Sequence, residues 1–331
     1  MPGSTTDGAT SLRQTLMATP TSLRLLVLYF PFFLACGVAS AQGLSPRAYV
    51  ITPTHSNAII LTYSYQSGDV VFDPSLPIAD ATGTSSLEIL SYFHTFSFFG
   101  RSANVNASLP YASSHLQATA SGIEGKVYRS GLAPAAGRFS VNLKGGPAMT
   151  VREFTEWRQR SVIGASFTIA PLTGQYDPAR LINIATNRWV FKPEIGFSRR
   201  WQSWVLDAYA ACSFFTANHN FFSRASSSAD PSTQTEQPIG AIEMHLSYDV
   251  KPRLWISIDG NYWYGGRTSL NGVANSTSLQ ANSRLGLTAA VPITQHQSLK
   301  FSYSGGTYVR FGGNYQDLSV AWQYSWLGRP N

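Results

Sequence analysis

The sequence DLSVAWQYSW, residues 317–326, alternates strictly between small or polar and large apolar side chains near the end of the chain. A period of two is typical of a β-strand with two unlike faces. The large residues of this stretch are Leu318, Val320, Trp322, Tyr324 and Trp326. In a water-soluble sheet such a face would cover a core, but a face rich in Trp and Tyr also suits a strand that meets lipid and ends in an aromatic belt. Recurrence of the pattern along an exported chain would favour the membrane interpretation.

The other end of the chain carries an export signal. Arg24 leads into Leu25–Cys36, an apolar run that is too short to span a bilayer as a helix. Ala39-Ser40-Ala41 then gives the small-x-small pattern that signal peptidase accepts. We therefore predict a signal peptide at residues 1–41, cleaved before Gln42.

Two alternatives concern this signal. Met17 would give a more ordinary signal length than Met1, so the true start is open. The second alternative is processing as a lipoprotein at Cys36. Phe33, three positions before this cysteine, fits a lipoprotein signal poorly. After Gln42 no window approaches 18 uninterrupted apolar residues, so a mature chain that spans a membrane does so as a closed barrel.

Composition excludes several classes of function. The chain has 331 residues, a formal charge of +7 and 12% charged residues, but its Lys and Arg residues are scattered singly, so we expect no nucleic-acid partner. Cys36 and Cys212 are the two cysteines. Removal of the signal leaves one thiol, which excludes an intrachain disulfide and metal sites built on paired cysteines. We predict no cofactor and no metal.

The alternating pattern recurs about twelve times along the chain. The predicted strands contain residues 59–65, 90–98, 105–109, 139–143, 163–169, 189–197, 204–214, 242–248, 254–264, 285–291, 299–303 and 317–326. Long polar connections alternate with short turns, which is typical of an outer-membrane barrel with short periplasmic turns and long extracellular loops. The predicted long connections are 67–86, 112–136, 172–187, 215–240 and 267–281.

These patterns predict an all-β protein: a transmembrane, antiparallel, up-and-down β-barrel of about twelve strands over residues 57–326. We expect residues 42–56 to form a short periplasmic segment, too short for a separate plug domain, and 327–331 to be a tail. One helix is predicted, on the periplasmic side, because Thr150 and Glu153 have capping-box spacing ahead of apolar residues. Aromatic residues gather near the predicted periplasmic strand ends, as expected of an interfacial girdle. They are Phe98, Phe99, Trp201, Trp204, Trp255 and Trp326.

Charged and polar residues of both signs lie on the strand faces opposite the apolar ones. They are Lys192, Glu194, Asp207, Glu243, His245, Asp259, Asn261, Lys300 and Arg310. They would line a solute path through the lumen or, equally, form a paired network that fills it. A barrel of about eight strands is filled by side chains and one of about sixteen holds water, and twelve lies between them.

Two predicted extracellular loops carry residues that could receive an apolar solute, or that pack the loops together instead. They are Tyr176, Asp177, Arg180, Phe221 and Phe222. An enzyme is the rival of another class, because a twelve-stranded barrel can host a lipase with a Ser-His pair. His94 is the strand histidine suited to that role, but no GxSxG-type context accompanies it, so we predict that the chain is not an enzyme.

Several segments resemble an outer-membrane barrel family described as transporters of the phenol-degradation (meta-cleavage) pathway. They are Thr173–Asn183 (TGQYDPARLIN), Asn187–Arg199 (NRWVFKPEIGFSR), Leu246–Pro252 (LSYDVKP), Gly265–Val273 (GGRTSLNGV) and Ser298–Ser304 (SLKFSYS). The resemblance implies a β-barrel in the bacterial outer membrane, in contact with its lipid, and suggests passive uptake of small hydrophobic or aromatic compounds. It supplies no binding residues. A structural or adhesive barrel without transport is the alternative, and the solute, the transport direction and the oligomeric state are open.

Overall fold

The computed structural model describes residues 44–71, 78–120, 123–180, 182–221 and 232–328. The predicted signal peptide at residues 1–41 lies outside these ranges, and so does Phe222. In the described part of the chain, no helix combines the length and the apolar character needed to cross a bilayer.

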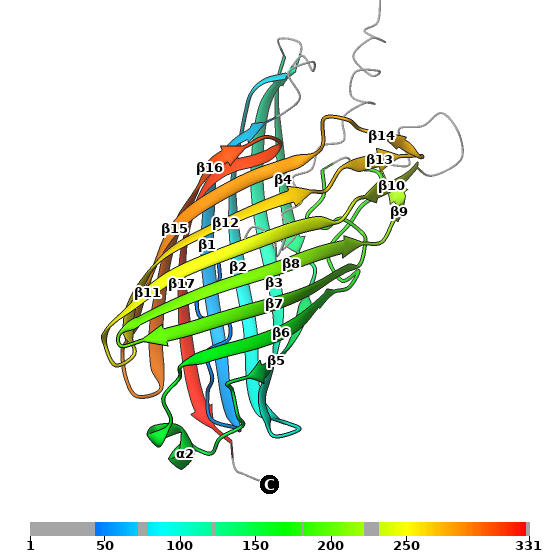
Figure 1. The fold of residues 1–331 in the computed structure, drawn as a ribbon. Helices are drawn as coiled ribbons and strands as arrows, with labels where there is room; N and C mark the ends of the chain where they lie inside the picture. Colours follow the sequence, from blue (N-terminus) through cyan, green and yellow to red (C-terminus); the bar gives the residue numbers. More distant parts are fainter. Residues whose placement is uncertain (1–43, 72–77, 121–122, 181, 222–231, 329–331) are drawn as a thin grey trace, which may run out of the picture. The chain divides into compact units, whose positions relative to one another are not determined.

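Twelve antiparallel strands form a closed sheet (Figure 1). They are β1 (Ser56–Val71), β2 (Ile78–Phe98), β3 (Arg101–Ala120), β5 (Ala136–Lys144), β6 (Ser161–Ala170), β7 (Val190–Trp201), β8 (Trp204–Phe215), β11 (Ile239–Lys251), β12 (Leu254–Gly265), β15 (Gln280–Pro292), β16 (Gln297–Val309) and β17 (Gly312–Leu327). Each pairs with the ring strands before and after it in sequence, and β1 pairs with β17 to close the ring. Leu61, for example, lies opposite both Leu90 and Trp322. The prediction of a barrel of about twelve strands is confirmed.

Two of the predicted long loops are largely strand instead. In the predicted loop 67–86, β1 continues to Val71 and β2 begins at Ile78. In the predicted loop 112–136, β3 continues to Ala120 and β4 (Ile123–Leu132) returns beside it. Most side chains of these extensions are polar or small, with Leu116 and Val127 among the exceptions, so the hydrophobic periodicity is lost while backbone pairing continues.

β4 lies beside the ring rather than in it. One edge of β3 pairs first with β5 and then, further along, with β4. The loop of residues 171–187 covers the place where the β3–β5 ladder ends: Gln175 N donates to Leu132 O at 2.7 Å, and Arg129 Nε donates to Ile182 O at 2.8 Å. Loop-to-strand hydrogen bonds therefore continue the wall at this point.

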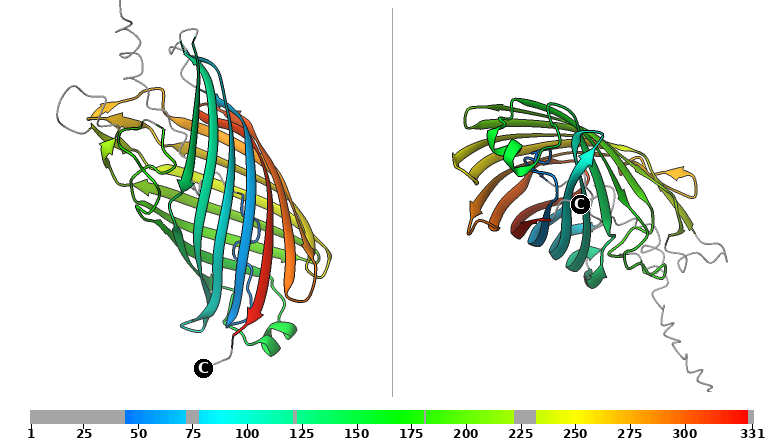
Figure 2. Two further views of the ribbon diagram at one scale, coloured as in Figure 1. Left: turned by 180° about the vertical axis from the view of Figure 1, so that it is seen from behind. Right: turned by 90° about the horizontal axis from the view of Figure 1, so that it is seen from below.

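Smaller elements lie at the two ends of the barrel (Figures 1 and 2). At one end a second sheet joins β9 (Asn218–Phe221), β10 (Ser232–Glu236), β13 (Thr268–Leu270) and β14 (Val273–Ala274). At the other end lies α2 (Val151–Glu156), whose predicted capping box is confirmed by reciprocal hydrogen bonds between Thr150 and Glu153. The backbone N–H and the hydroxyl of Thr150 donate to the Glu153 carboxylate and lower its pKa.

The two faces of the closed sheet have inverted polarity relative to a soluble protein. Ile242 and Ile258 point outward and are 57% and 61% exposed, whereas His245 and Asp259 point inward and are each 1% exposed. Apolar side chains face outward along the other strands of the ring in the same way. Because a bilayer core offers no water to backbone or side-chain polar groups, this inversion is the arrangement that lipid requires.

A charge on the outer wall tests the lipid-facing assignment. We expect Leu287→Arg, near the middle of β15, to lower the free energy of unfolding in lipid bilayers by about 2–4 kcal/mol. The matched inward change, Ser319→Arg on β17, should cost less than about 1 kcal/mol because the lumen is polar. Urea titration of the barrel folded into liposomes measures both, and equal losses would contradict the assignment.

Candidate functional site: the barrel lumen

An ionic chain runs across the inner face of the barrel. Lys192 Nζ lies 3.3 Å from Glu194 Oε2 and 3.8 Å from Glu243 Oε1. Glu243 Oε2 lies 3.6 Å from His245 Nε2, and His245 Nδ1 lies 2.9 Å from Asp259 Oδ1. Cations and carboxylates therefore alternate in space, so that each buried charge has an oppositely charged neighbour once His245 is protonated.

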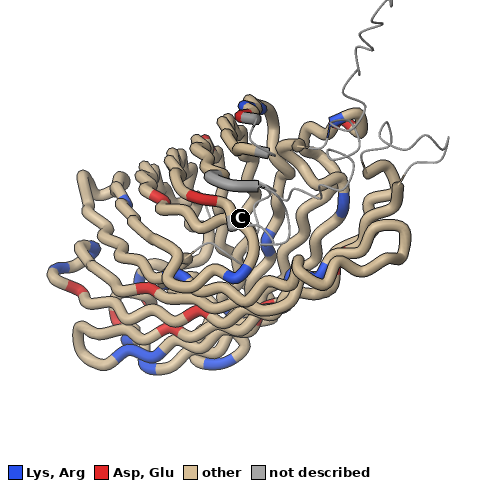
Figure 3. The backbone as a smooth tube through the Cα atoms, turned by 90° about the horizontal axis from the view of Figure 1, so that it is seen from above, with Lys and Arg blue, Asp and Glu red and all other residues tan. Residues whose placement is uncertain are grey.

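Strand order explains why residues so far apart in sequence meet. β7, β8, β11 and β12 are neighbours in the ring, and His245 lies opposite Asp207 on one side and Asp259 on the other. Glu243 lies opposite Asn261. Seven of the nine predicted lumen residues thus gather on four adjacent strands. Figure 3 shows acidic and basic residues interspersed along the strands rather than separated by sign.

The other two predicted lumen residues lie outside these four strands. Lys300 is on β16, opposite the buried Ala290 of β15 and the buried Ala321 of β17, so it lies on the lumen side of the strand. Its charge is attracted to that of Asp259, the last carboxylate of the ionic chain. Arg310 follows the end of β16 and is exposed, and its backbone N–H donates to Asn282 Oδ1 at 2.8 Å. Neither residue is recorded in an ion pair among the described residues.

Residues 44–55 lie inside the barrel, where Arg47 is the main polar anchor. The backbone N–H of Arg47 donates to Asp207 Oδ2 at 3.2 Å, and its Nε donates to Ser247 Oγ at 3.0 Å. Its Nη2 lies 2.7 Å from Asp249 Oδ1, and its guanidinium lies 4.4 Å from the centre of the Trp255 ring. These contacts hold the segment against β8, β11 and β12.

Tyr49 is the main packing anchor of the same segment and is almost completely buried. Its hydroxyl lies 3.0 Å from Glu194 Oε1 and 3.2 Å from Ser166 Oγ. Its ring lies against Gly164 and Gly196, where any Cβ atom would overlap it. Arg138 stacks over the ring at 5.1 Å and pairs with Glu194 at 3.0 Å, so Tyr49 joins the segment to the ionic chain.

Sequence reasoning did not find these anchors. Residues 42–56 have no regular pattern, and Arg47 and Tyr49 are single residues of ordinary type. A signal was nevertheless present, because Gly164 and Gly196 are paired on the inner faces of β6 and β7. Glycine inside a strand often marks the close approach of another part of the chain.

The predicted loop residues make contacts within the loops. Tyr176 joins the loop 171–187 to β9, because its hydroxyl donates to Asn220 O at 3.1 Å and accepts from Asn218 Nδ2 at 3.0 Å. Asp177 and Arg180 form an ion pair within one turn at 3.0 Å. Phe221 is buried in β9. These contacts are those expected of loop packing.

His94 has a polar partner other than a serine in the described part of the chain. Its Nδ1 lies 2.8 Å from Asn57 Oδ1, which also accepts from Tyr92 Oη at 2.7 Å, and its ring stacks on Phe96. Within the same ranges, no group of three or more His, Cys, Asp and Glu side chains is arranged to hold a metal ion.

Comparison with solved structures identifies the fold. The crystal structure of the COG4313 outer membrane channel from Pseudomonas putida F1 is similar with a TM-score of 0.70 and 15% sequence identity, covering 86% of this chain and 100% of that chain. The β domain of the Bordetella autotransporter BrkA has a TM-score of 0.48, 13% identity and coverage of 82% and 100%. The CymD monoaromatic hydrocarbon channel has a TM-score of 0.41, 9% identity and coverage of 84% and 90%. Of these three, the first alone is similar enough to support the fold assignment, which is that of a bacterial outer-membrane β-barrel.

No curated protein sequence matches the chain. A protein-family profile matches residues 63–322, which is most of the chain and nearly the whole ring of strands. The chain therefore belongs to the family described as "Putative MetA-pathway of phenol degradation".

Proposed function

We propose that this protein is an outer-membrane channel for the passive uptake of small hydrophobic or aromatic compounds. The observation that carries the proposal is a closed barrel with an apolar outer wall and a polar lumen that is crossed by one short segment, residues 44–55. The family's description connects it to phenol degradation, and the lumen residues described above suggest a solute path rather than an enzyme centre. The channel uses no cofactor and no energy source in this proposal.

The lumen contents set the selectivity of this channel. Arg47 and Tyr49 place backbone and side chains across the space between β6 and β12, beside the ionic chain of Lys192, Glu194 and Glu243. A narrow polar passage opposes hydrated ions, which lose solvation energy when they shed their water. A small uncharged aromatic solute has few hydrogen bonds to lose, so it passes the same constriction at lower cost.

A structural barrel without transport is the second candidate function. It is favoured by the paired, buried charges of Lys192, Glu194 and Glu243, because a network of this kind also fills and braces a barrel. The two functions differ in permeability, which can be measured directly.

We expect proteoliposomes that contain the folded barrel to take up phenol-like and alkylbenzene solutes several-fold faster than liposomes containing the heat-unfolded chain. The physical reason is that the folded barrel provides a continuous path across the membrane, which the unfolded chain does not. Uptake of radiolabelled solutes over a broad aromatic panel measures this effect. Equal rates with folded and unfolded protein would favour the structural barrel.

Residues 44–55 should act as the main barrier. We expect Tyr49→Ala, and separately Gly196→Ala, to raise single-channel conductance for small ions in planar bilayers about tenfold or more, because the first removes the ring and the second fills the space in which the ring lies. Gly240→Ala is the matched control, since its Cβ would be 3.9 Å from its nearest neighbour, Tyr264 O. Conductance that is unchanged in both lumen variants would show that the barrier lies elsewhere.

A further inference from the structure

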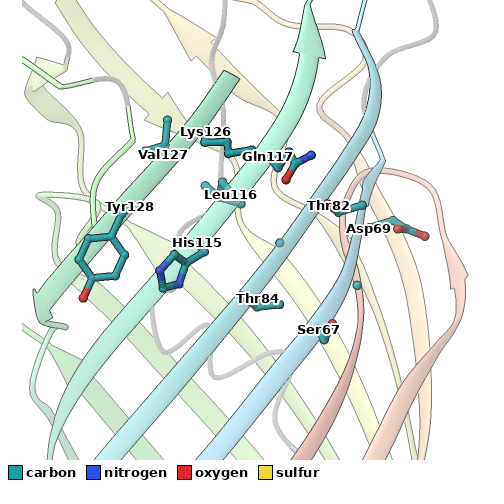
Figure 4. A pocket seen from close by; sticks show the side chains of 12 residues that line it. Ser67, Asp69, Thr82, Thr84, His115, Leu116, Gln117, Lys126, Val127 and Tyr128 are labelled. Atoms are coloured by element: carbon teal, nitrogen blue, oxygen red, sulfur yellow. The ribbon is translucent and has the colours of Figure 1, made fainter. Parts of the chain in front are cut away.

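A trough of about 520 Å³ crosses the outer face of β1–β4, on the lipid side of the wall rather than in the lumen (Figure 4). One row of side chains along it comes from Ser67, Thr84, His115 and Tyr128, which are successive cross-strand partners. Gly68 contributes to the floor between the rows. Regular pairing thus places one side chain from each of four strands along a single edge of the trough.

The second row has the same construction and comes from Asp69, Thr82, Gln117 and Lys126. Gly83 lies between Thr82 and Thr84 and contributes backbone to the floor of the trough, whereas the side on which a Cβ atom would stand faces Leu116 on the inner face of the sheet. A site of this size, within the usual range of about 300–1,000 Å³ for small-ligand pockets, accommodates one or two sugar rings.

The trough lies beyond the apolar belt, toward the loop end of the barrel. On β3 the outward side chains change from Leu109 and Tyr111 to His115 and Gln117. On β1 Tyr65 is the last large outward residue before Ser67 and Asp69. Tyr111 and Gln117 are about 20 Å apart along the strand at about 3.3 Å per residue. The trough therefore lies at the height of lipid head groups rather than of acyl chains.

The chemistry of the two rows is that of a saccharide site. The rings of His115 and Tyr128 lie 4.6 Å apart at 44°, which forms an aromatic platform for the apolar face of a sugar ring. Asp69, Gln117 and Thr82 supply acceptors and donors for neighbouring hydroxyl groups. Among the described residues these three side chains make no recorded hydrogen bond or ion pair.

The charges of the trough disfavour a bare phosphate as the ligand. Lys126 is its one Lys or Arg residue, and this Nζ is 3.0 Å from Glu124 Oε1. Asp69 adds a carboxylate in the same row. A site with one cation beside two carboxylates and an aromatic platform selects hydroxyl groups over a dianion.

We propose that this trough binds a saccharide unit of the lipopolysaccharide in the surrounding outer leaflet. The occupant must share the membrane with the barrel, because the two rows lie on the same outward side of the sheet as Tyr65, Leu109 and Tyr111. It must also present sugar hydroxyls just above the hydrocarbon layer, and lipopolysaccharide has both properties. The bound saccharide would contact β1, β2, β3 and β4 together, where these strands extend beyond the apolar belt.

Binding of deacylated lipopolysaccharide core oligosaccharide to the full barrel in detergent tests the proposal, with saturation-transfer NMR titration as the readout. We expect Tyr128→Ala and His115→Ala each to raise the dissociation constant about tenfold, the loss of one stacking contact. Tyr128→Phe, which keeps the platform, should bind within about threefold of the unchanged protein. Tyr303→Ala, an outward tyrosine of the belt on β16, is the matched control and should bind normally.

Two further ligands test whether the trough recognises the sugar or the phosphate of lipopolysaccharide. Dephosphorylated core oligosaccharide should bind as well as the phosphorylated form, and inorganic phosphate should not compete. Loss of binding on dephosphorylation, or equal binding by Tyr128→Ala and the unchanged protein, would overturn the proposal. Aromatic uptake by the Tyr128→Ala barrel should be unaffected, so the outcome is independent of the channel function.

Discussion

The whole structure depends on one constraint: hydrocarbon offers no hydrogen-bonding partner to a backbone N–H or C=O group. An open sheet would leave two edge strands unpaired in lipid, so β1 must find β17 at the other end of the chain. Their ladder runs from Ser56 opposite Leu327 to Val71 opposite Gly312 without a register shift. Once the ring is closed, alternation along each strand assigns every residue to lipid or to the lumen.

Inside the closed wall, buried charged side chains must be stabilised by other charged or polar side chains. Lys192, Glu194, Glu243 and Asp259 are removed from bulk water, and each loses solvation that a neighbouring charge or hydroxyl partly replaces. Residues 44–55 belong to the same network, because the Tyr49 hydroxyl donates a hydrogen bond to Glu194 and the Arg47 backbone N–H donates one to Asp207. The lining of the lumen and the segment that narrows it are therefore one electrostatic unit, and a change in either affects the other.

The sequence was most informative where lipid imposes a period of two. Residues 242–248 and 285–291 show the alternation clearly, and in the structure they lie within β11 and β15. Beyond the bilayer the strands need no apolar outer face. The sequence of the extensions of β2 and β3 therefore predicted polar loops, although their backbones remain paired. The contacts of Arg47 were unpredictable for another reason: they depend on which strands are neighbours in space, and no local pattern records that. Paired glycines at 164 and 196 were the available clue, and their meaning required knowledge of the register.

The position of residues 44–55 directly before β1 also constrains how the protein is assembled. β1 pairs with β17, the ring strand farthest from it along the chain, so the cylinder cannot be completed until β17 has been synthesised. The leading segment is attached to the strand that makes this final joint, and its contacts reach β7, β8 and β11 on the opposite side. Because the segment is anchored on these strands, the start of β1 is held within the ring that β17 completes, and the same contacts that narrow the lumen also fix one of the two strands of the closing pair.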